Sequence, residues 1–162
     1  MRSVLNGFLG TVSAVLFGLL VVTTTWQVIA RQVIHQPSTW SEELAKLLFV
    51  WLAFLGSALL FGERGHIAVD FLARRLPVVG QRVAQCFVQL MVLLFALVGM
   101  VWGGVLSSSI AWNQNMTALP VNLGWVYTVI PIAGVFIAVF AAMDLVAVAR
   151  GTQAPYDAAE EI

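Results

Sequence analysis

Three long stretches of this chain contain no charged residue. The stretches are 3–30, 47–62 and 83–143. A polar segment at 107–117, SSSIAWNQNMT, divides the third of them. A backbone in hydrocarbon must satisfy its own hydrogen bonds. Each of the four resulting segments is therefore expected to lie in a helix of about 20 or more residues. The sequence therefore predicts an all-α integral membrane protein with four transmembrane helices.

The predicted spans cover about 4–30, 43–62, 83–107 and 121–148. The composition agrees, because 60% of the residues are hydrophobic and 10% are charged, whereas soluble domains carry about 25% charged residues. Four spans use most of the chain, so we expect a single membrane domain over 1–162 with a C-terminal tail at 149–162.

The basic residues between the spans predict the orientation. The loop between the second and third spans holds four arginines, and each terminus adds one. The other side carries only Arg31 and Lys46. Because lysine and arginine are retained in cytoplasmic loops, we expect both termini and the 63–82 loop to be cytoplasmic.

The 63–82 loop itself has a helical pattern. Val69, Leu72 and Leu76 recur at a helical spacing that predicts a short amphipathic helix at about 66–76, lying in the membrane interface. Its Arg74 and Arg75 would meet anionic lipid head groups. An ordinary arginine-rich loop is the alternative interpretation.

The second span begins with charged residues. Thr39 to Glu42 has the spacing of a capping box, and Glu42 and Glu43 lie in the first turn, where the helix dipole favours carboxylates. Lys46 is within helical reach of both glutamates. These charges either cap the helix and extend to the interface, or form a polar contact with another subunit.

Candidates for chemistry are few. His35 and His66 are predicted on opposite sides of the membrane, so they cannot share a metal or a haem. No ionisable residue is predicted near the middle of a span, where ion pathways need one. With Cys86 as the single cysteine and zero net charge, the sequence indicates no enzyme, no cofactor and no nucleic-acid partner.

Small residues at helical spacing predict close helix packing. Gly99 and Gly103 form a GxxxG pair in the third span, and Gly134 and Ala138 form a similar row in the fourth. Such rows suit packing inside the chain and packing against a partner equally well.

The motifs together resemble a known family. Glu-Glu-x-x-Lys-x4-Trp-x3-Leu-Gly-Ser spans 42–57, and Gly-His-Ile-x-Val-Asp spans 65–70. Thr-Ala-Leu-Pro at 117–120, Trp-Val-Tyr at 125–127 and Ile-Pro-Ile at 130–132 continue the pattern. The chain resembles the DctQ-like small membrane subunit of TRAP (tripartite ATP-independent periplasmic) transporters.

This resemblance implies a function and partners. The chain would be a fixed scaffold in the bacterial inner membrane, paired as a heterodimer with a large elevator-type subunit that holds the substrate and sodium sites. A periplasmic binding protein would deliver an organic acid. The motif residues, with a structural or subunit-interface role, are Glu42, Glu43, Lys46, Trp51, Gly56, His66 and Asp70. Arginine is expected as often as lysine at position 46, and lysine would weaken a bidentate contact.

Two other functions remain as alternatives. A self-contained small multidrug-type carrier also has four helices, but it would need a carboxylate within the membrane, and 3–30 contains none. A membrane anchor subunit of a redox complex would need histidines that face each other across helices.

Overall fold

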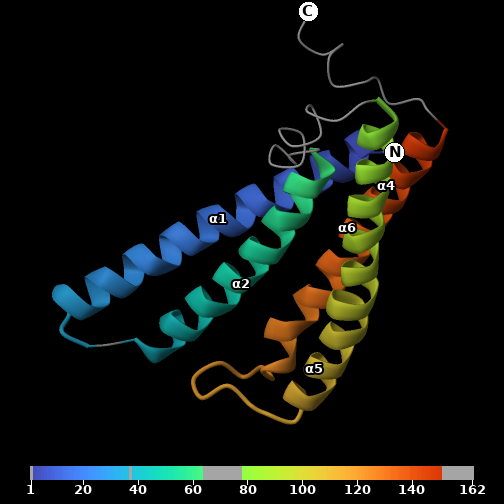
Figure 1. Cartoon of the computed structure of the whole chain (residues 1–162). Helices are drawn as coiled ribbons and strands as arrows, with labels where there is room; N and C mark the ends of the chain where they lie inside the picture. Colours follow the sequence, from blue (N-terminus) through green and yellow to red (C-terminus); the bar gives the residue numbers. More distant parts are fainter. Residues whose placement is uncertain (1, 37, 64–77, 151–162) are drawn as a thin grey trace, which may run out of the picture.

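The computed structural model describes residues 2–36, 38–63 and 78–150, and they are almost entirely helical (Figure 1). The helices are α1 (Arg2–Gln32), α2 (Thr39–Gly62), α4 (Val78–Leu94), η1 (Phe95–Trp102), α5 (Gly103–Ala111) and α6 (Gly124–Ala149). Four helical segments, 2–32, 39–62, 80–111 and 124–148, are long and apolar enough to cross a membrane. The predicted fold class is confirmed.

The first three helical segments extend a few residues beyond the predicted spans, whereas the fourth begins at Gly124, later than the predicted residue 121. The third one is continuous through α4, η1 and α5, and it is longer than predicted because the serines at 107–109 belong to its last turns. The predicted interfacial helix at 66–76, with His66, Asp70, Arg74 and Arg75, lies outside the described residues. So does the tail from 151 to 162.

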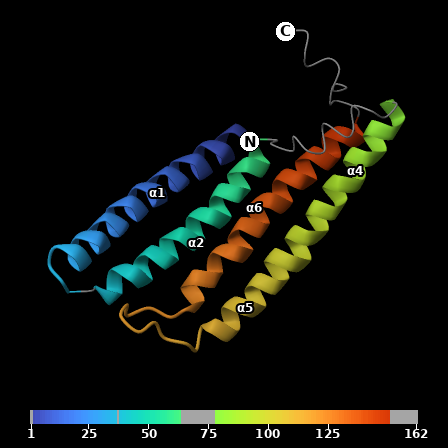
Figure 2. The same cartoon turned by 60° about the vertical axis from the view of Figure 1, so that its left-hand side comes forward.

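The four helical segments lie side by side in one layer (Figures 1 and 2). α1 packs on α2, α2 packs on α6, and α6 packs on α4, η1 and α5. α6 is the most buried of them. In its most apolar stretch, 44% of the residues are buried inside the molecule, against 11% for α1. A layer of this kind leaves most apolar side chains on its two faces, which suits a lipid environment.

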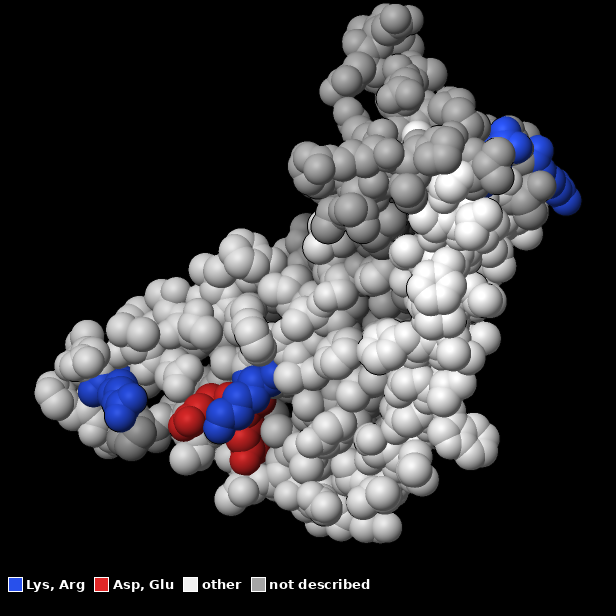
Figure 3. All heavy atoms as spheres, in the orientation of Figure 1, with Lys and Arg blue, Asp and Glu red and all other residues white. Residues whose placement is uncertain are grey.

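Each end of the layer contains both N-terminal and C-terminal helix ends, because the helices alternate in direction. Arg2, Gly62 and the end of α6 lie at what we call the terminal end, and the 112–123 loop lies at the loop end (Figure 1). Charged side chains gather near these ends, and uncharged surface lies between them (Figure 3).

Small residues set the closest approach between α6 and the third segment. A Cβ atom added at Gly134 would lie 2.7 Å from the Cβ atom of Met100, and one added at Gly104 would lie 2.7 Å from Cδ of Pro131. Ala138 belongs to the same core, 8% exposed. Gly134 and Ala138 therefore pack inside the chain.

Gly99 and Gly103 do not make this contact. An added Cβ atom at Gly99 would meet only the ring of Phe95, one turn earlier, and one at Gly103 would meet only the carbonyl of Val98. Residues 95–102 are π-helical, and the wider turn changes which residues face α6. The GxxxG pair is thus turned away from α6, and packing against a partner stays a prediction.

Candidate subunit interface and its polar clasps

The start of α2 differs from the predicted capping box. Ser38 is the N-cap residue, and its side chain makes no capping hydrogen bond. The helix therefore begins at Thr39, which places Glu42 one position too far along to complete the box. Ser41 is fully buried, and its hydroxyl donates to the carbonyl oxygen of Ser38 at 2.9 Å. This bond goes to a carbonyl oxygen, so it does not replace the contacts to backbone N–H groups that define a capping box.

Lys46 pairs with Glu42. Its Nζ lies 3.4 Å from Oε1 of Glu42, one turn earlier on the same helix. The two side chains are 69% and 55% exposed, so the pair contributes less than about 1 kcal/mol to stability. Both groups are open to a partner at the surface of the layer.

Glu43 makes a different contact, which we call the glutamate clasp. Its Oε1 accepts a hydrogen bond from the backbone N–H of Thr117, and its Oε2 accepts from those of Ala118 and Leu119, each at 2.9 Å. The three donors are 74 to 76 residues away in the sequence. The clasp ties the first turns of α2 to the 112–123 loop.

Trp51 and Gly56 occupy different sides of α2. The indole Nε1 of Trp51 donates to the carbonyl oxygen of Trp125 at 3.1 Å, in the first turn of α6. Trp125 in turn stacks at a tilt on Trp112, with ring centroids 5.6 Å apart. A Cβ atom added at Gly56 would meet nothing within 4 Å, so this glycine is open to close approach from outside.

The terminal end holds a second contact, the arginine clasp. The Arg2 guanidinium forms an ion pair with Asp144 and donates to the carbonyl oxygens of Gly62 at 2.7 Å and Phe61 at 3.2 Å. It also lies 5.7 Å from the ring centroid of Phe140. The clasp joins the start of α1, the end of α2 and α6, and it satisfies carbonyl groups that a helix end leaves free.

Sequence reasoning did not find this clasp. The sequence shows Arg2 only as a basic residue at one terminus and Asp144 only as the residue that ends the uncharged stretch 83–143. The available signal was the acidic residue near the end of an apolar span, since such a residue usually needs a cation on the same side of the membrane. In the structure the Asp144 side chain is only 4% exposed.

An apolar groove runs between α2 and the third helical segment, with α6 as its floor. Its volume is about 470 Å³. It is lined by Phe54, Ser57, Phe61, Met91, Val92, Phe95, Met100 and Ile137. The exposed stripe of α2, which adjoins the groove at Ser57, consists of Glu42, Lys46, Phe49, Ala53, Ser57 and Leu60. Motif residues Glu42 and Lys46 thus lie on one continuous outward surface with the groove.

Metal ligands are not grouped in the described part of the chain. No set of three His, Cys, Asp or Glu side chains there could hold a metal ion. The geometry offers helix packing surfaces and two polar clasps.

Comparison with known proteins identifies the family. The sequence model of the DctQ component of tripartite ATP-independent periplasmic transporters matches residues 20–151. The sialic acid TRAP transporter small permease protein SiaQ of Vibrio cholerae is 27% identical over 136 residues, which cover 84% of this chain and 78% of that protein.

Two longer relatives match as well. The sialic acid TRAP transporter permease protein SiaT of Haemophilus influenzae is 41% identical over 83 residues, 51% of this chain but 13% of that protein. The isethionate TRAP transporter permease protein DctMQ of Oleidesulfovibrio alaskensis is 26% identical over 134 residues, 78% of this chain and 21% of that protein. The chain thus corresponds to a small part of each longer permease. It belongs to the DctQ component family of TRAP transporters, whose members are membrane-embedded transporter components and not enzymes.

Proposed function

We propose that the chain is the small membrane subunit of a TRAP-type secondary transporter and serves as a fixed scaffold for a large membrane subunit. The large subunit, of the elevator type, would move an organic acid with sodium. A periplasmic binding protein would deliver that acid. The complex would lie in the bacterial inner membrane with both termini of this chain in the cytoplasm, as the loop arginines predict.

The observation that carries the scaffold role is the position of the charges. In the described residues, the charged side chains of the spans lie within about two turns of a helix end, and none lies mid-span. The one buried ion pair, among those described, serves to join helices at the terminal end. A transport path usually needs a polar or ionisable group within the membrane or an interrupted helix, and a second subunit would have to supply it.

The relatives support a large partner. In SiaT and DctMQ the segment similar to this chain makes up 13% and 21% of a longer permease. The rest of such a permease is the natural source of the substrate path. We therefore expect a separate large subunit to occupy the equivalent place beside this chain.

The surface for that subunit is the exposed stripe of α2 with the adjoining groove. Ala53, Gly56 and Ser57 are small, and such residues allow helices to approach closely in lipid. The exposed Glu42–Lys46 pair adds a polar contact at the loop end. The motif residues His66 and Asp70 lie outside the described residues.

The substrate class rests on the names of the relatives. Sialic acid and isethionate differ in size, and one is a carboxylic acid while the other is a sulfonic acid. Their common feature is one acidic group on a polar organic molecule, which supports an organic acid as the cargo here.

Reconstitution tests the proposal. The chain alone in liposomes should show no sodium-driven uptake of sialic acid or isethionate, even with a binding protein present. Together with its large subunit and binding protein, uptake of the cognate acid should appear and should collapse when the sodium gradient is removed. Sodium-driven uptake by the chain alone would contradict the scaffold role and favour a self-contained carrier.

A further inference from the structure

The glutamate clasp uses most of the capacity of its carboxylate. An ionised carboxylate has about four acceptor positions on two oxygens, and Glu43 fills three of them with backbone N–H groups at 2.9 Å. Little capacity remains for a partner subunit. Glu43 therefore has a different task from its neighbour Glu42, whose carboxylate lies at the surface beside Lys46.

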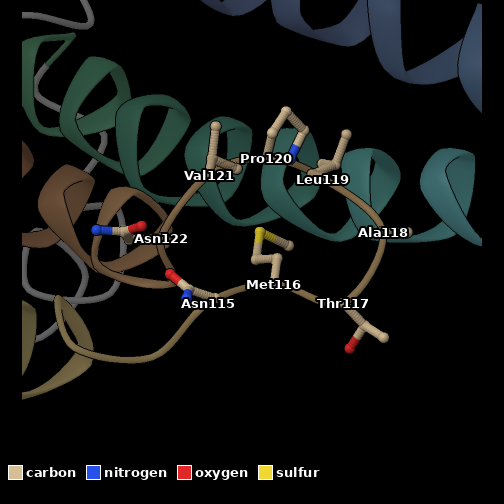
Figure 4. A pocket seen from close by; sticks show the side chains of 8 residues that line it. All are labelled: Asn115, Met116, Thr117, Ala118, Leu119, Pro120, Val121 and Asn122. Carbon is tan, nitrogen blue, oxygen red and sulfur yellow. The ribbon is translucent and has the colours of Figure 1, made fainter.

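The loop that Glu43 holds is closed at its base. Met116 N–H donates to the carbonyl oxygen of Val121 at 3.1 Å, and Leu123 N–H donates to that of Gln114 at 2.7 Å. The chain between these bonds forms a ring, with the side chain of Met116 inside it and that of Thr117 pointing away (Figure 4). The clasp binds the tip of this ring, so the loop is fixed at its base and at its tip.

Only glutamate fits this arrangement. Three successive N–H groups directed at one anion form a concave backbone site that favours negative charge. Glutamine at position 43 would offer one acceptor oxygen and would turn an N–H₂ group toward N–H donors. Aspartate would keep the charge but is one methylene shorter, so it would not reach the loop with both oxygens.

A second tie lies further along the same seam between α2 and α6. Trp51 is eight residues beyond Glu43, about 12 Å along the helix axis, and its indole bonds to Trp125 in the first turn of α6. The two contacts hold the loop-end half of α2 beside α6. The wall of the groove that α2 provides, at Phe54 and Ser57, follows directly after them.

We propose that Glu43 is a positioning residue of the transporter: it anchors the tip of the 112–123 loop across the ends of α2 and α6 and thereby preforms the groove for the large subunit. The assignment of the groove to that subunit rests on the proposed function. Preforming a binding surface strengthens association because less ordering is needed on binding. Glu43 thus acts through the loop and the seam, and Glu42 and Lys46 are left for direct contact.

Hydrogen exchange of the isolated subunit in lipid nanodiscs tests the clasp. In Glu43→Gln and Glu43→Asp, the amides of Thr117, Ala118 and Leu119 should exchange at least about tenfold faster, because local opening becomes easier. The matched control Glu42→Gln removes an adjacent carboxylate and should leave these amides unchanged. Core amides of α6 should stay protected, which a general loss of structure would not allow.

Co-purification with the large subunit tests the consequence. Recovery of the large subunit should fall about threefold or more in both Glu43 variants, because the groove is no longer preformed. Unchanged exchange at 117–119 would overturn the clasp as a positioning device. Faster exchange with full recovery of the large subunit would overturn its role in assembly. If the wild-type chain itself recovers no large subunit, the proposed function fails, whereas the exchange result still judges the clasp.

Discussion

The arginine clasp should be the most costly contact to break from one side. Asp144→Asn keeps the shape of the side chain and removes its charge, and Arg2→Met keeps an unbranched stem and removes the guanidinium. In the first variant, Arg2 keeps its bonds to the carbonyl oxygens of Gly62 and Phe61. In the second, a carboxylate that is 4% exposed loses its ion pair with Arg2, and the end of α2 loses two donors. Arg2→Met should therefore be the more damaging change.

The magnitude follows from burial. Breaking a buried ion pair from one side costs about 3–5 kcal/mol, and Arg2, whose side chain is 19% exposed, can regain some hydration. We expect about 2–3 kcal/mol for Asp144→Asn and about 3–4 kcal/mol for Arg2→Met. For a chain of this size the corresponding fall in thermal midpoint is about 5–15 °C. The double variant should be about 2 kcal/mol more stable than the two single losses added together, since it removes both charges of the ion pair.

Thermal unfolding of the purified chain in detergent, followed by tryptophan fluorescence, measures these values. Arg150→Gln is the matched control, because Arg150 is an exposed arginine at the same end of the molecule, and its loss should change stability by less than about 0.5 kcal/mol. A double variant whose loss equals the sum of the single losses would show that the two side chains are not coupled. The reasoning from the buried ion pair would then be refuted.

Three further predictions follow from single positions. In a background without Cys86, a cysteine introduced at Thr117 should react with an impermeant thiol reagent from the periplasm. A cysteine introduced at Arg82 should react only after the membrane is breached, and the reverse pattern would contradict the predicted orientation. Gly134→Ala should lower the free energy of unfolding by about 1–3 kcal/mol through overpacking, whereas Gly99→Ala should change it little. Equal losses in thermal unfolding would contradict the assigned α6 contact. Lys46→Glu should reduce recovery of the large subunit more than Lys46→Ala, since it adds repulsion beside Glu42. Full recovery of the large subunit with both variants would leave Lys46 without an interface role.

The helices could be predicted because a single local property determines them. Uncharged stretches of sufficient length must be helical in lipid, and their positions can be read directly along the chain. The clasps could not be predicted in this way. Glu43 was recognised as a motif residue, but its donors are backbone N–H groups of a loop more than 70 residues away, and no residue type marks such a donor. Arg2 and Asp144 were each visible, but their pairing depends on which helix ends meet.

The sequence also did not show which residues of the third helical segment face α6. The GxxxG spacing picks out residues small enough for close packing. In a regular α-helix, Gly99 and Gly103 would lie on one face and could pack together against a neighbouring helix. The π-helical turns at 95–102 interrupt this relation, so that Gly104 meets Pro131 instead. The spacing of small residues does not show where a helix changes its hydrogen-bonding pattern, so this contact could not be predicted from it.

The positions of the two clasps show how a single layer of helices is held together. Apolar side chains gain little from leaving lipid for a protein interior, so helix association in a membrane depends on close packing and on polar contacts. In this chain the packing residues lie along α6, whereas the polar contacts lie at its two ends, through Asp144 at one and the 112–123 loop at the other. Both clasps connect to α2, which is therefore held near each end while its middle keeps an uncharged outward face. An ion pair at mid-span would instead place charge in the apolar stretch of the helices, where charged side chains are costly.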